Sequence, residues 1–568
     1  MKKFVYLASL LIFSVSFSYS ANLQNVIPLS ADLYDDIDLL YLTEGLGRAS
    51  TARPWTTNEA SLILSRVQKE KLSPSELILY EKSYTFLKEP LRFNYKDEFA
   101  FDVSLDGNFE IYAHSNSEDF ITDRDWVYSF EKRKSLLKLN ISFEVGEFFY
   151  IFTDLQYSKN RFRDKDSLFD VGGVGNPSIG AIIDETRPPG KIAIKSLFYT
   201  SPFSTNVMWP PSDLDMQTPK RAIASVGGKK WNFNLSRDRI KWGNSHIDNF
   251  IVSEHIDFHE YARLNIFTDN FKYEWLNIFF ETNPYSGWNL ELSKDKDFRI
   301  FMAHRLEFRI LNKVTFSISE NIMYSNDVFD LRFMNPAFIY HNINNSAMFN
   351  AIAHLEIDYA ICKGFNTYIQ AVLDQARAPN EAASQPDAFG VLGGFEWAKA
   401  FSKGVFSASV EYAYTNPALY HRNGVDFLMF RGYPTLEYRI VSHIDYIGFK
   451  YGPDTHAVQI EFTYRDPKRG VVGLKLLGLR EGEVNFFTEW EDIINIRTNS
   501  PSGEKVEETA IISFWGKVGL PKKLFSLLDI AFWYELDIIG KQTYLKESSL
   551  YKNHKSDVQF TLGFSVTL

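Results

Sequence analysis

The sequence predicts an all-β fold, a transmembrane antiparallel β-barrel of about 16–18 strands with a small N-terminal helical bundle. Apolar and polar residues alternate with a period of two over many stretches of about 9–11 residues, the length of a tilted strand that crosses a membrane. Aromatic residues make up 16% of the chain, although its mean hydropathy is only −0.21. A barrel explains both values, because its strands show one face to lipid and the other to a polar lumen, and aromatic rings collect at the two membrane interfaces.

Residues 1–20 have the pattern of a signal peptide. Lys2 and Lys3 form a positive start, an apolar stretch follows, and small serines precede Ala21. The apolar stretch is too short to span a membrane well as an uncleaved anchor. A lipoprotein would need a cysteine at the cleavage point, and this sequence has none there. We therefore expect an exported chain whose mature form begins at Ala21 and resides in the cell outer membrane.

Residues 21–95 are predicted to form a periplasmic helical segment. Ser73 and Glu76 make a capping box, and Asn58 can cap the preceding helix. Short amphipathic helices are stable only when their apolar faces pack against another part of the protein. We expect them to pack together against the periplasmic mouth of the barrel. The expected helices are residues 30–45, 58–70 and 74–89.

From residue 96 the period changes to two, so residues 96–568 are assigned to the outer-membrane barrel. Residues 137–145 alternate Leu, Ile, Phe and Val with Lys, Asn, Ser and Glu, and residues 458–465 behave in the same way. No helical run interrupts these stretches, which indicates antiparallel hairpins. Beyond residue 20 there is no apolar run of about 18 residues, so a helical membrane protein is excluded.

The last eleven residues are the clearest strand. Val558, Phe560, Leu562 and Phe564 fall on one face, and polar residues and Gly563 fall on the other. Such a strand resembles the C-terminal signal that outer-membrane assembly machinery reads. A secreted β-sandwich is the soluble alternative, but it would need a second sheet to cover these apolar faces. Long polar stretches between the strands are expected to be exterior loops. They are residues 164–191, 201–222, 375–388 and 497–508.

The charge and cysteine content exclude several classes of partner. A formal net charge of −10 argues against nucleic acid, because neutralising phosphates needs clustered Lys and Arg. Cys362 is the only cysteine and can form no internal disulfide or thiolate metal site. His255 and His259 could hold a metal on a helix, but their neighbours predict strand and loop instead. We expect no metal and no cofactor.

Two parts of the chain carry a distinctive series of motifs, one at residues 237–253 and the other at residues 303–336. An Arg-rich strand ends in Trp-Gly, and further on a His-Arg-Leu-Glu strand, a Ser-Glu-x-x-x-Tyr strand and an Asn-Pro pair follow one another. These motifs resemble those of the capsule assembly Wzi family, although the chain is long for that family and residues 480–555 match nothing in it. The resemblance implies a barrel of about eighteen strands with a periplasmic bundle, which binds surface polysaccharide like a lectin and catalyses nothing. The blocks that carry it are residues 237–243, 250–253, 303–308, 319–324 and 334–336.

Charged residues in predicted strands are the first set of candidate functional residues. Lipid does not accept charges, so we expect these side chains to face the lumen. The plainer interpretation is a network of ion pairs that braces the barrel, and we favour it over a binding surface. The predicted brace consists of Arg237, Arg239, His304, Arg305, Glu307 and Glu320.

A second set has the chemistry of saccharide recognition. Flat aromatic faces suit the apolar side of a sugar ring, and guanidinium or imidazole groups suit its hydroxyls and carboxylates. Interface anchoring is the plainer interpretation of any single Trp. The predicted polysaccharide-binding residues are Trp209, Arg187, Trp242 and His246.

The leading hypothesis is a non-enzymatic barrel that anchors capsular or other surface polysaccharide, with outer-membrane lipid and the assembly machinery as its other partners. A porin for small solutes is the alternative, and an outer-membrane hydrolase is a third. The hydrolase is disfavoured because the acids and histidines near residues 248–260 have no nucleophile motif beside them. The N-terminal helices and long loops favour a closed lumen over a porin.

Overall fold

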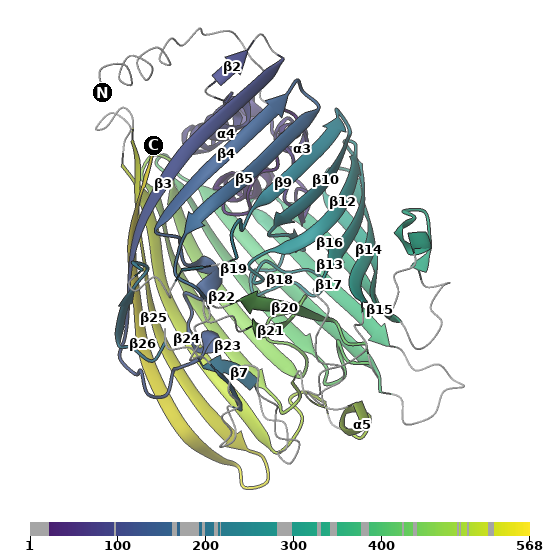
Figure 1. The fold of residues 1–568 in the computed structure, drawn as a ribbon, viewed down its shortest axis with the longest axis vertical. Helices are drawn as coiled ribbons and strands as arrows, with labels where there is room; N and C mark the ends of the chain where they lie inside the picture. Colours follow the sequence, from purple (N-terminus) through teal and green to yellow (C-terminus); the bar gives the residue numbers. More distant parts are fainter. Residues whose placement is uncertain are drawn as a thin grey trace.

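The chain folds as a closed antiparallel β-barrel of 18 strands, as the alternation in the sequence predicted. Each barrel strand pairs with the next one along the wall, and long connections leave and re-enter at one end (Figure 1). The computed structural model describes residues 22–91, 93–95, 98–161, 167–170, 192–195, 199–208, 214–215, 217–280, 298–326, 331–340, 349–375, 386–422, 425–434, 440–485, 488, 490–496, 499–520 and 528–568.

The barrel wall is formed by the following strands in order: β3 (Phe99–His114), β4 (Leu137–Val145), β5 (Phe149–Tyr157), β9 (Ala222–Gly228), β10 (Trp231–Asp238), β12 (His259–Phe267), β13 (Phe271–Phe279), β14 (Phe298–Ile310), β15 (Val314–Asn326), β16 (Phe349–Cys362), β17 (Phe365–Gln375), β18 (Ala388–Ala400), β19 (Val405–Thr415), β22 (Thr455–Asp466), β23 (Gly470–Glu481), β24 (Lys505–Gly519), β25 (Asp529–Leu545) and β26 (Leu550–Thr567). Two short strands, β2 (Phe93–Tyr95) and β8 (Phe203–Thr205), pair with β3.

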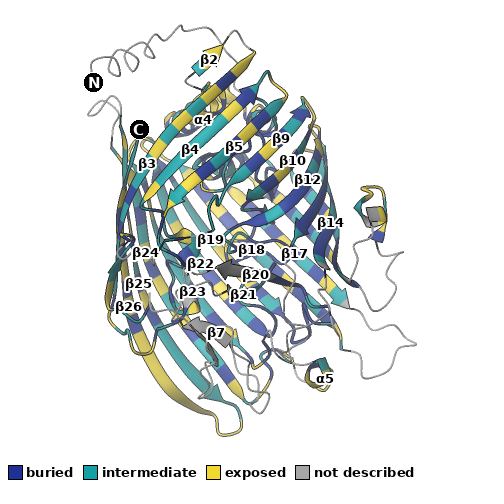
Figure 2. Ribbon diagram, viewed as in Figure 1, coloured by how far each residue is buried: buried dark blue, intermediate teal, exposed yellow. Residues whose placement is uncertain are grey.

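The C-terminal strand closes the wall. β26 pairs with β3, with Phe560 opposite Ala113, and the backbone N–H of Leu568 donates to the Leu105 carbonyl at 3.0 Å. Closure leaves no unpaired edge, which lipid would not tolerate. Phe560 is exposed on the outside and Gln559 is buried, so the alternation predicted for this strand is confirmed. Figure 2 shows the same alternation of buried and exposed residues along the other strands.

The two ends of the barrel differ. Short turns, such as those at Gly146 and Gly364, join the strands at the end where the helices lie, and long connections join them at the opposite end (Figure 1). Outer-membrane barrels keep short turns in the periplasm and long loops outside the cell. On this general rule we call the helical end the periplasmic end and the opposite end the exterior end.

Three helices lie at the periplasmic end: α2 (Leu33–Glu44), α3 (Thr57–Leu64) and α4 (Pro74–Lys88). The predicted capping box of α4 is present, because the Ser73 N–H donates to Glu76 Oε2 at 2.7 Å. Thr56 and not Asn58 caps α3, so the expected cap was two residues too late: the Thr56 hydroxyl accepts from the Glu59 N–H at 3.3 Å. The apolar faces of the helices pack together and against the wall residues Ala398 and Val405. None of the helices in the described part of the chain is long and apolar enough to span a membrane.

Shorter elements lie in the connections. Two-stranded pairs are formed by β1 (Ala52–Arg53) with β11 (Lys241–Trp242), by β20 (Leu428–Pro434) with β21 (Ile440–Tyr446), and by β6 (Ser167–Asp170) with β7 (Ile192–Lys195). One short helix is α5 (Trp490–Ile493), and 3₁₀ turns occupy Lys69–Lys71, Asp123–Asp125, Phe130–Lys132 and Leu331–Met334.

Candidate functional site: a filled lumen with an exterior cavity

The segment between α2 and α3 enters the lumen. Its strand β1 pairs with β11, with Ala52 opposite Trp242. Ser50 Oγ donates to Glu307 Oε2 at 3.0 Å, and Lys272 Nζ donates to the Ala52 carbonyl at 2.9 Å. Because Glu307 and Lys272 belong to β14 and β13, these bonds fix the segment to the barrel wall.

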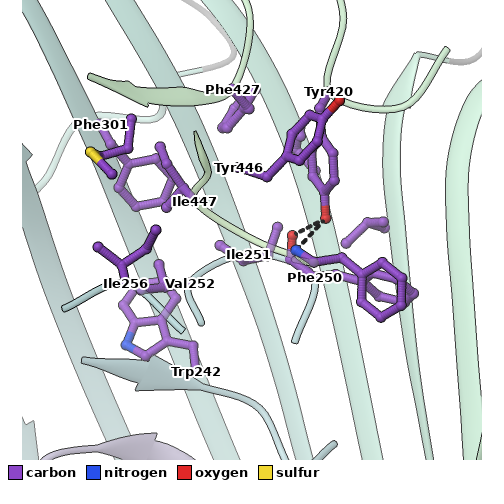
Figure 3. Close-up of a cluster of buried hydrophobic side chains, with 14 of the residues drawn as sticks. Trp242, Phe250, Ile251, Val252, Ile256, Phe301, Tyr420, Phe427, Tyr446 and Ile447 are labelled. Atoms are coloured by element: carbon purple, nitrogen blue, oxygen red, sulfur yellow. Dashed lines mark hydrogen bonds between the residues drawn. The ribbon is translucent and has the colours of Figure 1, made fainter. Parts of the chain in front are cut away.

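Two exterior connections fold back into the lumen and meet this segment. Figure 3 shows their apolar side chains, including Trp242, Phe250 and Phe427, packed against each other and against Phe301 of β14. Tyr420 Oη donates to the Phe250 carbonyl at 2.6 Å and so links the two connections. The lumen thus holds an apolar core at its middle. We call residues 45–56, 240–258, 416–422, 425–434 and 440–454 the lumen plug.

Gly243 explains the Trp-Gly pair that stood out in the sequence. Its φ of +125° is a conformation that side chains strongly disfavour, and a Cβ added there would lie 2.0 Å from Asn249 Oδ1. The turn brings the Ser245 N–H within 3.2 Å of the same amide oxygen. Only glycine lets the chain reverse so tightly after Trp242.

Arg305 and Glu307 face the lumen, as predicted, and both are buried. Arg305 Nη2 donates to Thr51 Oγ1 at 2.6 Å and to Ser317 Oγ at 2.8 Å, and it lies 3.2 Å from Glu356 Oε2. Glu307 lies 3.4 Å from the same Arg305 atom. This cluster joins the wall strands β14, β15 and β16 to the plug, which is the geometry that a brace requires.

The expectation that Arg237 faces the lumen is wrong. Residues of β10 alternate between faces, and Asp238, not Arg237, lies on the buried inner face. Arg237 instead forms an ion pair with Glu260, its register partner on β12, at the exterior end of both strands. The position explains how the charge is tolerated, because the outer rim of the wall meets lipid headgroups and water.

His304 and Glu320 also face outward, contrary to the prediction. They lie opposite each other on β14 and β15 and alternate with the inward residues Arg305 and Ser319. Lipid does not touch them directly, because residues 331–340 pack against the outer wall there. The backbone N–H of Tyr340 donates to Glu320 Oε2 at 2.9 Å, and the Tyr340 and His304 ring centroids are 4.4 Å apart.

Apolar residues of the outer wall are covered by the same segment. Met302 and Ile322 point away from the lumen, yet both are fully buried under Phe338 and Tyr340. Tyr273 Oη donates to the Pro336 carbonyl at 2.5 Å, which explains the place of the Asn-Pro pair noted in the sequence. We call residues 331–340 the outer segment.

Trp242 is fully buried in the lumen core, where its indole N–H donates to Glu274 Oε1 at 2.6 Å. Protein atoms cover both faces of the ring, so its predicted role as a sugar-stacking residue does not fit this position. Arg239 lies between β10 and β11, outside any strand, and lines a cavity in the exterior half of the lumen.

His246 lines the same cavity and remains partly exposed, with its Nε2 atom 2.7 Å from Glu396 Oε1. Burial lowers the pKa of His246, but the hydrogen bond and charge of Glu396 outweigh burial and raise the pKa above its usual value. The other two predicted polysaccharide-binding residues, Trp209 and Arg187, lie outside the described residues.

The cavity has a volume of about 430 Å³ and lies between the plug and the wall strands β22 to β25. Apolar residues form one part of its lining, with Leu477, Leu479 and Ile511 from the wall and Trp126 and Tyr451 from exterior connections. Apolar and aromatic surface beside charged groups is the combination that saccharides use. We call this space the exterior cavity.

The charged lining of the exterior cavity contains more Lys and Arg than Asp and Glu, although the whole chain is acidic. Arg239, Lys450 and Lys475 have no carboxylate within ion-pair distance among the described residues. In contrast, five carboxylates of the lining do have a cationic partner. The pairs are Asp125–Lys541, Glu131–Arg161, Asp248–His255, Glu254–Lys241 and Asp445–His255.

His255 is held between two of these acids. Its Nδ1 atom is 3.1 Å from Asp248 Oδ2, and its Nε2 atom is 3.7 Å from Asp445 Oδ1. Burial alone would lower the pKa of His255, but the two carboxylates outweigh it and raise the pKa to about 10. His255 is therefore a fixed positive charge at neutral pH, and it ties the two plug connections together. Among the described residues, no group of three or more His, Cys, Asp or Glu is arranged to hold a metal.

A closed barrel with an outward apolar face, a periplasmic helical bundle and a filled lumen defines an outer-membrane β-barrel of the plugged kind. No known family profile matches the chain, and no curated protein matches its sequence. A solved structure of Wzi, described as a carbohydrate-binding β-barrel outer-membrane protein involved in group 1 capsule assembly in Escherichia coli, shares the fold. It superposes with a TM-score of 0.52 at 12% identity over 95% of this chain and 99% of that one.

Two other outer-membrane barrels are more distant. OprD and OccK3 (OpdO) of Pseudomonas aeruginosa each give a TM-score of 0.37 at 8% identity, over 82% of this chain and 95% of theirs. The fold predicted from the resemblance to the Wzi family is thus confirmed. At such low identities the comparisons establish fold, and function has to be argued from this chain's own residues.

Sequence reasoning missed the exterior cavity and most of its lining. Lys450 and Lys475 lie far apart along the chain and have no motif around them. A usable signal was present at residues 250–252, where three consecutive apolar residues, Phe250-Ile251-Val252, interrupt a polar connection. A run without alternation indicates burial on all sides, which inside a barrel means a plug.

Proposed function

We propose that this protein binds and anchors surface polysaccharide at the outside of the cell, without chemical turnover. The observation that carries the proposal is the filled lumen with its exterior cavity, since a filled lumen suits holding a polymer better than passing solutes. The likeness in fold to a barrel described as carbohydrate-binding supports the same class of function. A signal peptide at residues 1–20, the periplasmic segment 21–95 and assembly by the outer-membrane machinery remain part of this proposal.

Polymer retention in this proposal comes from many weak contacts. One aromatic or guanidinium contact is worth roughly 0.5–2 kcal/mol, so several along one chain are needed. Replacing Trp209 or Arg187 alone is expected to weaken retention of glycan without abolishing it. Replacing several exterior residues together is expected to release polymer into the medium while the barrel still assembles.

A deletion strain tests the proposal. Loss of the gene should reduce cell-attached polysaccharide and increase the soluble fraction, with total synthesis unchanged, and the wild-type chain should restore attachment. Purified protein immobilised in detergent should retain polysaccharide isolated from its own host. Unchanged attachment in the deletion strain, together with no binding in vitro, would reject the lectin-like function in favour of the porin alternative.

A further inference from the structure

The exterior cavity has a charge balance that the rest of the lumen does not share. At the periplasmic side, Arg263 pairs with Glu274 at 2.7 Å and Lys272 pairs with Glu59 at 2.7 Å, so buried charges there are neutralised. In the cavity, Lys450 and Lys475 are half-buried and face each other's charge, and neither has a carboxylate within ion-pair distance among the described residues. Tyr451 and the charge of Asp248 stabilise the Lys450 cation, whereas burial and the neighbouring lysines destabilise the Lys475 cation. A ligand anion relieves the cost at Lys475.

The carboxylates nearest to the two lysines all have other partners. Glu461, the register partner of Lys475 on β22, is outside ion-pair distance of Lys475 and lies 3.8 Å from His246 Nδ1. Glu535 lies in the same region but is engaged by Lys132, 3.3 Å away. Asp248 is near Lys450 but is paired with His255, and its Oδ2 also accepts the Lys450 backbone N–H at 2.7 Å. The positive groups therefore stay available to a molecule that enters the cavity.

Arg239 adds a planar donor to the two lysines. Its neighbour Glu254 is engaged by Lys241 at 2.9 Å, and the Arg239 Nε atom is buried without a hydrogen-bond partner. Guanidinium groups match the two oxygens of a carboxylate or a phosphate better than ammonium groups do. Arg239 lines the cavity with its Nε–H unsatisfied, so its guanidinium is available to donate to an oxyanion.

We propose that the exterior cavity binds the anionic groups of an acidic saccharide, with Arg239, Lys450 and Lys475 as the contacting cations. The apolar lining at Leu477, Leu479 and Tyr451 receives the ring faces of the same residue or its neighbour. The cavity volume of about 430 Å³ suits one or two sugar units and not a polymer segment lying flat. This inference rests on the proposed function and adds the charge class of the glycan and the place where it is read.

The direct test compares one polymer in three chemical forms. Polysaccharide isolated from the host is bound to the purified full-length protein as the native polymer, after reduction of its carboxylates to alcohols, and after removal of phosphate by hydrofluoric acid. Loss of binding in one treated form supports the inference and names the anion as carboxylate or phosphate. Equal binding of all three forms overturns the inference and leaves the proposed function intact, whereas no binding of any form rejects the proposed function itself.

Substitutions locate the anion. Lys475→Gln, Lys450→Gln and Arg239→Gln are each expected to weaken binding of the native polymer by about fivefold, the upper range for a half-exposed ion pair, and the triple variant by more. Lys403→Gln removes the same charge from an exposed periplasmic turn and is expected to bind like the wild type. A triple variant with wild-type affinity overturns the inference.

Competition keeps the test valid if a variant fails to assemble. Free galacturonate should displace native polymer from the wild-type protein at concentrations where galactose does not, if carboxylate is the anion, and glucose 6-phosphate should do so if it is phosphate. Added salt should weaken binding, because the cavity is partly open to solvent. Equal displacement by galactose and by both charged sugars would overturn the inference.

Discussion

The periplasmic half and the exterior half of the lumen contain the same types of charged residue but pair them differently. In the periplasmic half, Arg263, Lys272 and Arg305 each meet a carboxylate within 3.4 Å and a carbonyl or hydroxyl of the N-terminal segment. In the exterior half, cations outnumber the acids that could pair with them, and open space remains between them. The difference teaches that charged residues in a barrel lumen brace it where they are paired, and are available to a ligand where they are not.

The largest expected effect falls on the paired half. Replacing Arg305 with Met leaves Glu307 and Glu356 buried without their shared cation, so the free energy of unfolding should fall by about 3–5 kcal/mol. Urea unfolding of the detergent-solubilised protein, followed by tryptophan fluorescence, measures this. Arg469→Met, at an exposed periplasmic turn, is the matched control and should change stability little. A stability of Arg305→Met equal to that of the control would show that the cluster is not a brace.

The second effect is a pH dependence set by His255, which lines the cavity in the exterior half. Its folded pKa of about 10 lies above the ordinary value of 6.5, so its contribution is complete below pH 6.5 and is lost as pH rises towards 10. Wild-type protein should lose stability over that window more steeply than His255→Gln, which lacks the ion pairs with Asp248 and Asp445. Parallel stability curves for the two proteins from pH 6 to 10 would contradict the assignment.

The smallest expected effect concerns the outer segment. Tyr340→Ala removes the ring contact with His304 and part of the cover over Ile322. The ring contact stabilises the outer segment by about 0.5–1.5 kcal/mol, in addition to the effect of the apolar area that Tyr340 buries. The barrel should stay assembled, while cleavage by trypsin after Arg332 becomes faster. The same change at Tyr359, an exposed outer-wall residue, should leave that cleavage rate unaltered.

The alternation of apolar and polar residues made the strands of the wall predictable. The clearest case is residues 558–568, in the strand that closes the barrel. The direction of single charges was less predictable. The argument that Arg237, His304 and Glu320 must point inward assumed that lipid touches every outward position. At Arg237 the outward position is the rim, where Glu260 pairs with it, and at His304 a segment more than 25 residues further along the chain covers the wall.

The plug could not be predicted from the sequence, because it too depends on contacts between segments that are distant along the chain. Its parts come from three separate stretches, and the contacts between them, such as Tyr420 with the Phe250 carbonyl, depend on the closed barrel that surrounds them. Trp242 illustrates this limit. An aromatic residue beside a glycine is equally compatible with a residue that stacks on a sugar ring and with a residue of the apolar core. Burial decides between them, and a single sequence does not report burial.

Single-channel recording of the intact chain in a planar bilayer tests the central claim most directly. A lumen filled by the plug and closed below by α2, α3 and α4 should give little steady conductance in either polarity, with or without added polysaccharide. Large, stable, ion-selective channels from the intact protein would contradict the account, because an open lumen is what a diffusion porin requires.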